Sequence, residues 1–154
     1  MTLFLRKFCE GDLGKIIEIE KASFPDPWSR NGFLYHYRTN PQGFIVAEDG
    51  GEVVGYAVAR IEATFELRNL SIYRRCHLAN LAVEPKKRKM GMGTKLLEEI
   101  LRYARRKGAK EVYLEVRTKN ASARRFYEKK GFIEKGFKKR YYSDDDAVIM
   151  ALTI

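Results

Sequence analysis

The stretch Leu78-Ala79-Asn80-Leu81-Ala82-Val83-Glu84-Pro85, with the turn Arg88-Lys89-Met90-Gly91-Met92-Gly93 after it, decides the fold of this 154-residue chain. It reads as a buried apolar strand, a basic turn with two glycines, and the start of an amphipathic helix. The first N–H groups of a helix lack partners within the helix and carry positive partial charge. The glycines allow a ligand to approach this backbone, and the first two residues of the turn add full positive charges. The turn is therefore typical of a site for a diphosphate.

Other phosphate motifs do not fit this turn. Lys95 does not follow a glycine, which excludes a Walker loop, and Leu96 stands where a dinucleotide fingerprint needs its third glycine. The alternative that remains is a solvated basic turn without a ligand.

Composition restricts the classes of protein to consider. The length fits a single domain over residues 1–154, and no stretch is long and apolar enough to span a membrane. The N-terminus lacks a signal pattern, so we expect a cytoplasmic protein that binds no membrane. The net charge of +10 attracts polyanions such as RNA, a ribosome surface or a phosphorylated cofactor. We expect no specific nucleic-acid partner.

The two cysteines do not indicate a disulfide or a metal centre. Cys9 and Cys76 are far apart in sequence and form no CxxC motif, so we expect free thiols packed as small hydrophobic residues. The neighbouring His77 would add only one further ligand, and two adjacent ligands make no zinc site. We expect no metal.

Periodicity and turn signals predict an α/β (α+β) domain with a mixed sheet of about seven strands. The expected strands span residues 2–8, 43–48, 52–62, 77–83, 110–117, 132–139 and 141–152. The expected helices span residues 12–23, a short segment after Ser29, 91–107 and 120–131. Residues 63–75 are polar, and we expect a loop there that leads into the next strand.

A second group of candidate residues follows the strand at 110–117. Asn120, Ala123 and Tyr127 share one helical face, which suggests a groove for something narrow. The alternative interpretations are that Asn120 is a plain N-cap and that Tyr127 is an amphipathic core residue whose hydroxyl contacts solvent. Glu115 shares a strand face with Tyr113, where it either pairs with a surface arginine or accepts a proton.

These residues resemble the GNAT acyltransferases. The turn at 88–93 is similar to the acetyl-CoA pyrophosphate loop of that superfamily, [QR]-x-x-G-x-[GA]. The helix with Asn120, Ala123 and Tyr127 resembles its second segment that contacts CoA. The resemblance covers nearly the whole chain and weakens over residues 63–75. It implies the GNAT fold, a mixed and mostly antiparallel sheet of about seven strands flanked by about four helices.

Two further stretches resemble particular branches of the superfamily. Phe24-Pro25-Asp26-Pro27-Trp28-Ser29 is similar to the first inter-helix loop of RimI-type enzymes, which acetylate the α-amino group of ribosomal proteins. Tyr141-Tyr142-Ser143-Asp144-Asp145-Asp146-Ala147 resembles the tyrosine-rich hairpin of archaeal and eukaryotic N-terminal acetyltransferases. That family has a glycine where this chain has Asp145. Residues 26–28 also depart from the Glu-Asn-Tyr common in archaeal members, so no first-residue preference is implied.

The resemblance implies a role for each part of the site. Acetyl-CoA lies between the fourth and fifth strands, which splay apart. The implied cofactor contacts are Leu81, Ala82, Val83, Arg88, Lys89, Met90, Gly91, Met92, Gly93, Thr94, Asn120, Ala123 and Tyr127. Glu115, with His77 as a second group, accepts the amine proton through an ordered water, and Tyr127 protonates the leaving thiolate. The implied slot for the substrate's chain end consists of Phe24, Pro27, Trp28, Tyr141 and Tyr142.

We therefore expect an N-terminal protein acetyltransferase that uses acetyl-CoA, acts on ribosomal or other cytoplasmic proteins, and is a monomer or a weak dimer. Association with the ribosome would use the basic surface. One alternative is a GNAT enzyme for a lysine side chain, a polyamine or another small amine. The other is a basic RNA- or ribosome-binding module with a degenerate GNAT fold.

Overall fold

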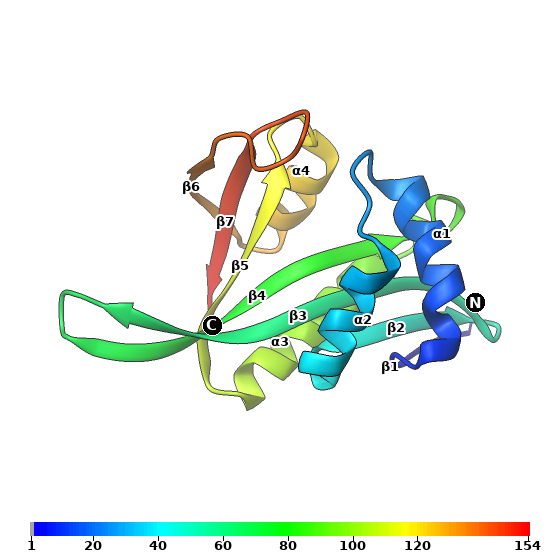
Figure 1. The fold of residues 1–154 in the computed structure, drawn as a ribbon, viewed down its shortest axis with the longest axis horizontal. Helices are drawn as coiled ribbons and strands as arrows, with labels where there is room; N and C mark the ends of the chain where they lie inside the picture. The colour runs from blue at the N-terminus through cyan, green and yellow to red at the C-terminus, as the bar shows by residue number, and fades with distance from the viewer. Residues whose placement is uncertain (1) are drawn as a thin grey trace. The chain divides into compact units, whose positions relative to one another are not determined.

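The computed structural model describes residues 2–154 and contains one seven-stranded sheet in the order β1-β2-β3-β4-β5-β7-β6 (Figure 1). The strands are β1 (Leu3–Lys7), β2 (Phe44–Asp49), β3 (Glu52–Glu66), β4 (Ser71–Val83), β5 (Ala109–Arg117), β6 (Ile133–Lys138) and β7 (Ala147–Thr153). The α-helices are α1 (Leu13–Ser23), α2 (Arg30–Thr39), α3 (Met92–Arg106) and α4 (Ala121–Lys129). Strands β4 and β5 run parallel, and the pairs β1–β2, β2–β3, β5–β7 and β6–β7 run antiparallel. The predicted fold class is confirmed.

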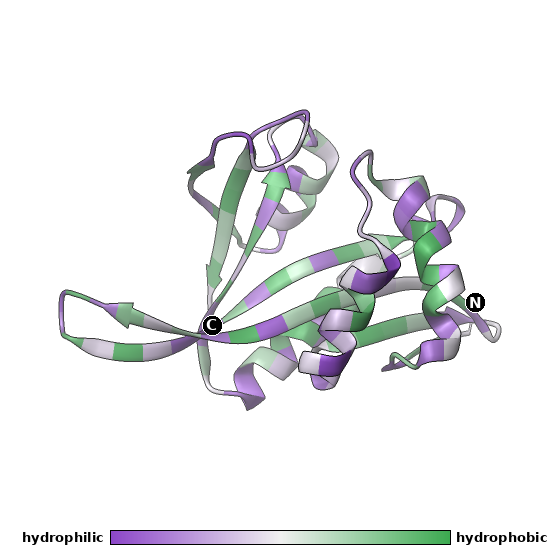
Figure 2. Cartoon of the chain, in the orientation of Figure 1, coloured by the Kyte–Doolittle hydropathy of each residue, from purple (hydrophilic) through white to green (hydrophobic). Residues whose placement is uncertain are grey.

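Residues 63–75 correct the prediction of a loop. Strand β3 continues to Glu66 and β4 begins at Ser71, so the two strands form a long hairpin (Figure 2). The hairpin exposes its large apolar side chains, namely Phe65, Leu67, Leu70 and Ile72. The aromatic and β-branched residues favour a strand, but they are not buried on one face. Amphipathic alternation therefore does not predict the two strands in this segment.

The stretch 141–152 corrects a second prediction. Strand β7 begins only at Ala147, and residues 140–146 form a loop between β6 and β7. The side chains of Asp145 and Asp146 accept hydrogen bonds from backbone amides of this loop, which competes with strand pairing.

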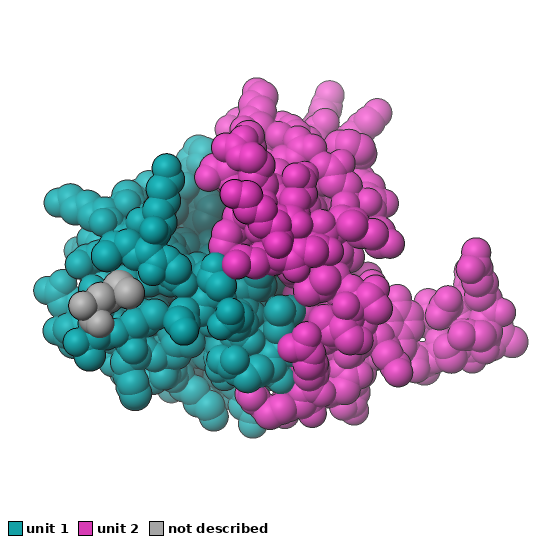
Figure 3. Space-filling model, turned by 180° about the vertical axis from the view of Figure 1, so that it is seen from behind, with its two compact units in different colours: residues 1–60, 78–103 teal, residues 61–77, 104–154 magenta. Residues whose placement is uncertain are grey.

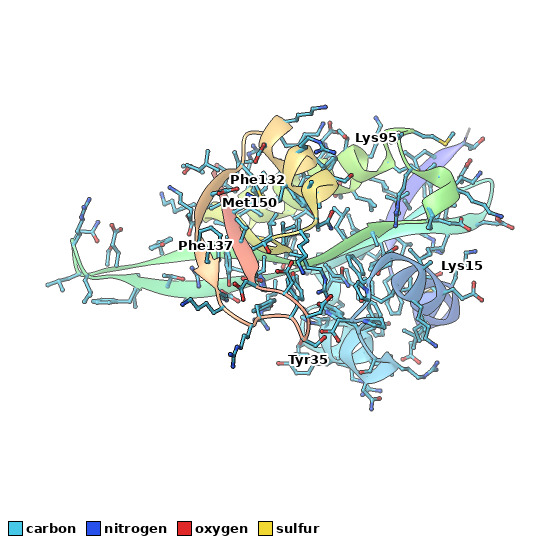
Figure 4. All side chains as sticks on the ribbon, turned by 90° about the horizontal axis from the view of Figure 1, so that it is seen from above. Lys15, Tyr35, Lys95, Phe132, Phe137 and Met150 are labelled. Carbon is cyan, nitrogen blue, oxygen red and sulfur yellow. The ribbon has the colours of Figure 1, made fainter. Side chains whose placement is uncertain are left out.

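The chain divides into two compact units, residues 1–60 with 78–103, and residues 61–77 with 104–154 (Figure 3). Each unit is compact in its own right, and one domain over residues 1–154 stays a prediction. In the first unit, Lys15 of α1 and Tyr35 of α2 lie on one side of the strands, and Lys95 of α3 lies on the other (Figure 4). The core of this unit is a cluster of Phe8, Leu13, Ile16, Ile19, Phe33, Phe44, Val46, Val53, Tyr56, Val58 and Ala82.

The second unit is built on β5, β7 and β6 with α4. Phe132 packs edge-on against Tyr127 of α4, with the ring centroids 5.4 Å apart. Phe132 and Met150 are buried, whereas Phe137 on β6 is exposed (Figure 4). Phe132, which precedes β6, thus packs against α4 through Tyr127.

Both cysteines are free thiols. Cys76 is buried as expected, whereas Cys9 is exposed, which corrects the expectation that both are packed. Among the helices of residues 2–154, none has the length and apolar character of a membrane span.

Candidate active site

The basic turn before α3 leaves a run of backbone amides unused. Lys89 and Gly91 adopt left-handed conformations with φ of 63° and 85°. Within residues 2–154, the amides that close this turn on backbone carbonyls belong to Lys87, Arg88 and Lys95, and those of residues 89–94 donate no hydrogen bond. A Cβ on Gly91 would meet no atom within 4 Å, so this backbone is open to a ligand. Unpaired amides at a helix start fit an anion.

Arg88 is tied to its own unit. Its Nε donates to the carbonyl of Val83 at 2.9 Å, and one terminal nitrogen donates to the hydroxyl of Ser23 at 2.9 Å. The guanidinium therefore joins the turn to the end of β4 and the end of α1. Its positive charge stays beside the turn, because hydrogen bonds to neutral acceptors do not neutralise it.

The end of β4 carries the three residues that the resemblance assigns to the pantetheine arm. Ala82 and Val83 are buried and Leu81 is half-buried. Gly55 of β3 lies against this segment, where a Cβ would approach the carbonyl of Ala82 to 3.0 Å. The side chains therefore pack within the unit and the backbone remains the feature available for pairing.

A buried carboxylate holds the loop between α1 and α2. Glu20 is 1% exposed and accepts hydrogen bonds from the amide of Trp28 at 2.8 Å and the side chain of Asn80 at 2.7 Å. The hydroxyl of Tyr56 also donates to it. Burial, and then the charge of Glu20, raises the pKa of Tyr56. The Trp28 ring stacks on His36 with centroids 4.7 Å apart.

The other predicted substrate residues of this loop differ in burial. Phe24 and Trp28 are half-buried and pack on the core, whereas Pro27 is exposed. The loop thus has a fixed inner side and an open outer side.

In the second unit, the structure places His77 directly against Glu115. Their strands are in parallel register, with His77 opposite Tyr113, so the two side chains share one face. The imidazole Nε2 lies 2.6 Å from Glu115 Oε1. The two groups are therefore in direct contact, and this distance leaves no room for a water between them. A carboxylate and an imidazole in contact are suited to general base catalysis.

Glu115 is enclosed by donors, with only 4% of its side chain exposed. Lys138 Nζ lies 3.3 Å from Oε2, and the hydroxyl of Tyr141 donates to Oε1 at 3.3 Å. Burial favours the protonated acid, but the hydrogen bond and charge of His77, with the charge of Lys138, outweigh it. The pKa of Glu115 is therefore held below its ordinary value, and the group is a carboxylate near neutral pH.

Behind His77 lies a further carboxylate. Glu62 Oε2 is 3.9 Å from His77 Nδ1, and Glu62 Oε1 accepts from the hydroxyl of Tyr113 at 2.5 Å. The Tyr113 ring stacks on the imidazole at 4.6 Å, and Arg75 lies 4.1 Å from the centre of that ring. His77 is thus held between two carboxylates and against an aromatic ring.

Helix α4 supplies Asn120, Ala123 and Tyr127. The side chain of Asn120 accepts from the amide of Ala123 at 3.1 Å, so it is an N-cap, as one of the two readings expected. Tyr127 is 7% exposed. Burial, and then the nearby Tyr142, raises its pKa, so the phenol keeps its proton at neutral pH.

Asp145 stands where the resemblance implies a glycine, and it anchors the loop that carries Tyr141 and Tyr142. Its Oδ1 accepts from the hydroxyl of Thr118 at 2.5 Å and its Oδ2 from the amide of Lys119 at 3.0 Å. These hydrogen bonds lower the pKa of Asp145. In the same loop, the hydroxyl of Tyr142 donates to the carbonyl of Glu115 at 3.2 Å. Asp145 therefore joins the loop to the turn before α4.

The structure brings Glu115, His77, Tyr141 and Tyr142 together within the second unit. Sequence reasoning missed Glu62, Lys138 and the anchoring role of Asp145. The alternation of β5 does place Tyr113 on the face of Glu115, but no local signal relates Glu62 or Lys138 to that face, because strand register decides it.

Comparisons with known proteins identify the family of this chain. Residues 13–132 match the model of the acetyltransferase (GNAT) family. The N-alpha-acetyltransferase of Sulfolobus acidocaldarius is 40% identical over 144 residues, covering 91% of this chain and 86% of that protein. The ribosomal protein bS18-alanine N-acetyltransferase of Escherichia coli is 31% identical, covering 93% and 92%. The crystal structure of Ard1 from Thermoplasma volcanium matches with a TM-score of 0.87 and 29% identity, covering 100% and 99%.

Proposed function

This chain belongs to the acetyltransferase (GNAT) family and is an acetyl-CoA-dependent N-acetyltransferase, and we propose that its acceptor is the α-amino group of a protein N-terminus. The observation that carries the proposal is the contact of Glu115 with His77 beside Tyr141 and Tyr142. A base flanked by aromatic side chains suits the end of a peptide chain. Similar proteins of nearly the same length are named for this reaction.

The first unit has the groups that bind acetyl-CoA. We assign the diphosphate to the amides of residues 89–94, because they are unpaired and Gly91 is open. Arg88 and Lys89 supply positive charge there. The backbone of Leu81, Ala82 and Val83 pairs with the pantetheine arm as an added strand would. When bound, the cofactor supplies a thioester carbonyl that an amine can attack.

In the second unit, we assign Asn120 and Ala123 to cofactor binding. Each unit also has a candidate for contact with the first residues of the target: residues 24–28 in the first unit, and Tyr141 with Tyr142 in the second. We propose ribosomal or other cytoplasmic proteins as targets. Association with the ribosome, a monomeric or weakly dimeric state and a cytoplasmic location stay predictions.

Proton transfer is the task of Glu115, His77 and Tyr127. An α-amino group has a pKa of about 7.7–8.0, so at neutral pH much of it is protonated and must lose a proton. Glu115 is ionised near neutral pH and receives that proton together with His77. Tyr127 keeps its own proton and donates it to the departing thiolate. Holding the two reactants in attack geometry supplies a large share of the rate.

The test is an acetylation assay with two peptide libraries, read by mass spectrometry. One library has free α-amino groups and varied first residues, and the other has blocked N-termini and internal lysines. We expect acetylation of the first library only. Faster acetylation of the lysine library, or of a polyamine, would instead establish the side-chain or small-amine alternative.

Two matched variants distinguish a catalytic role of Glu115 from a general effect of removing one negative charge. Glu115→Gln should lower kcat about ten- to a hundredfold. Glu111→Gln removes the same charge from the same face of β5, four residues earlier, and should leave kcat within about twofold. Equal losses in the two variants would contradict the role of Glu115.

A further inference from the structure

The last part of β3 is an open strand edge. The register of β2 on β3 ends with Phe44 opposite Val58, whereas β3 continues to Glu66. Among residues 2–154, the neighbours of β3 in the sheet are β2 and β4, so no strand lies beside residues 60–66 on the β2 side. A strand edge with unpaired backbone groups is a template for pairing with another chain.

The direction of the backbone groups along this edge follows from Ala59. Its carbonyl accepts a hydrogen bond from Asn40 Nδ2 at 2.7 Å, and a Cβ on Gly43 would lie 2.0 Å from the same oxygen. Asn40 and Gly43 come just before β2, so this carbonyl points to the β2 side. In an antiparallel strand, the N–H and C=O of one residue point to the same side, and successive residues alternate.

Three residues beyond Ala59 therefore direct both backbone groups to the open edge, namely Ile61, Ala63 and Phe65. No turn or loop of residues 2–154 makes a backbone hydrogen bond to them. Their side chains share one face of the strand. Ala63 is exposed, Phe65 is 53% exposed and Ile61 is half-buried. The edge thus offers backbone donors, backbone acceptors and apolar side chains to a partner.

The sequence of this edge is complementary to itself when two copies run antiparallel. With Ala63 of each copy opposite the other at the centre, every position faces a suitable residue of the second copy. Arg60 faces Glu66, Ile61 faces Phe65, and Glu62 faces Thr64. Opposite charges and apolar pairs directly across a ladder are stabilising. The charged pair also falls at positions without backbone hydrogen bonds, where opposing side chains are closest.

Other registers of the same edge are less favourable. A shift of the centre by one residue places Glu62 against Glu66 or against itself, and like charges directly opposite each other are destabilising. A shift by two residues toward the N-terminus shortens the ladder, because β2 already covers Val58. A shift by two residues toward the C-terminus reaches the turn at residues 67–70. The charges and the two ends of the edge therefore select one register.

We propose that residues 60–66 of β3 form an interface with a second copy of this chain, paired antiparallel about Ala63. The contact has two-fold symmetry, so the same surface serves on both copies. The outward backbone groups of the two edges bond each other, and the sheets join into one. Each Phe65 ring packs against Ile61 of the second copy. The paired segment is short, so the dimer forms reversibly and at high protein concentration.

Charge reversal tests the register by sedimentation equilibrium of the full chain. Arg60→Glu sets two glutamates opposite each other at both ends of the ladder and should raise the Kd of the dimer about tenfold or more. Glu66→Arg should have the same effect, whereas the double variant should associate like the native protein. Arg68→Glu makes the same charge change in the exposed turn and is the matched control, for which the Kd should stay unchanged.

Ala63→Pro tests the backbone pairing. A proline is tolerated on a strand edge whose N–H faces outward, so this variant should fold, as circular dichroism can check, and stay monomeric. A native chain that remains monomeric up to about 1 mM would overturn the proposal. A dimer that persists in Ala63→Pro, or one that the double charge reversal does not restore, would overturn it as well. These measurements need no acetyl acceptor, so failure of the proposed function would leave their result unchanged.

Discussion

The carboxylate of Glu20 accepts a hydrogen bond from the backbone amide of Trp28, with Oε2 2.8 Å from the nitrogen. This bond ties the last turn of α1 to the proposed substrate loop. Asn80 of β4 and Tyr56 of β3 share the same carboxylate, so one side chain joins four segments of the first unit.

Removal of this carboxylate should destabilise the protein. Glu20→Ala leaves one buried donor and two part-buried donors unsatisfied, and we expect the free energy of unfolding to fall by about 3 kcal/mol. Urea denaturation measures the loss. Glu18→Ala is the control, since that side chain is 74% exposed on the same helix and should cost little. Similar losses in both variants would show that the network contributes nothing.

Gly91 offers a test of the diphosphate site that separates strain from binding. Its φ of 85° means that any side chain is strained, so the effect of Gly91→Ala includes a stability loss of about 1 kcal/mol. Gly51→Ala is the matched control, because its φ is also 85° and its Cβ would likewise meet no atom within 4 Å. Both variants should lose similar stability, but only Gly91→Ala should weaken acetyl-CoA binding, by about tenfold in calorimetric titration. If the two variants bind acetyl-CoA with equal affinity, the turn is not part of the diphosphate site.

Tyr127→Phe tests the proton donor. The ring should stay packed against Phe132, and kcat should fall about ten- to a hundredfold with peptide binding almost unchanged. Single-turnover kinetics and peptide titration provide the two measurements. Tyr73→Phe removes a phenol of β4 that has no assigned role in the site, and it gives the comparison for loss of a hydroxyl elsewhere in this unit. A native kcat for Tyr127→Phe would remove the residue from the chemistry.

The buried tyrosines predict a loss of stability at high pH. Burial raises the pKa of Tyr56, Tyr113 and Tyr127 above their ordinary value near 10. The unfolded chain therefore loses these protons first, so their contribution is complete below about pH 10 and is lost as the pH rises further. Each contributes a slope of up to about 1.4 kcal/mol per pH unit. Denaturation of Tyr127→Phe between pH 9 and 11 should show a smaller slope than the native protein, and an identical slope would contradict this.

Asp145 should control peptide binding through its loop. Asp145→Ala removes the contacts to Thr118 and Lys119, so we expect the KM for peptide to rise several-fold and that for acetyl-CoA to change less. Asp145→Asn keeps one oxygen acceptor and should lie between the alanine variant and the native protein. If Asp145→Ala retains the native peptide KM, the loop does not depend on this anchor.

The sequence alone determined most of the secondary structure and the candidate residues. Ser29 and Asn120 cap their helices as predicted, accepting from Gly32 and Ala123. The strand–turn–helix order around Gly91 was also evident. These features depend on residues a few positions apart, which share one helical turn or one strand face.

Only the tertiary structure decided how the catalytic side chains meet. Glu115 contacts His77 across 38 positions of sequence, and Tyr113 contacts Glu62 across 51. Such contacts follow from strand register, which alternation along a single strand does not specify. The path of residues 63–75 and the anchoring by Asp145 were hidden for the same reason, since pairing and hydrogen bonds between distant segments fix them.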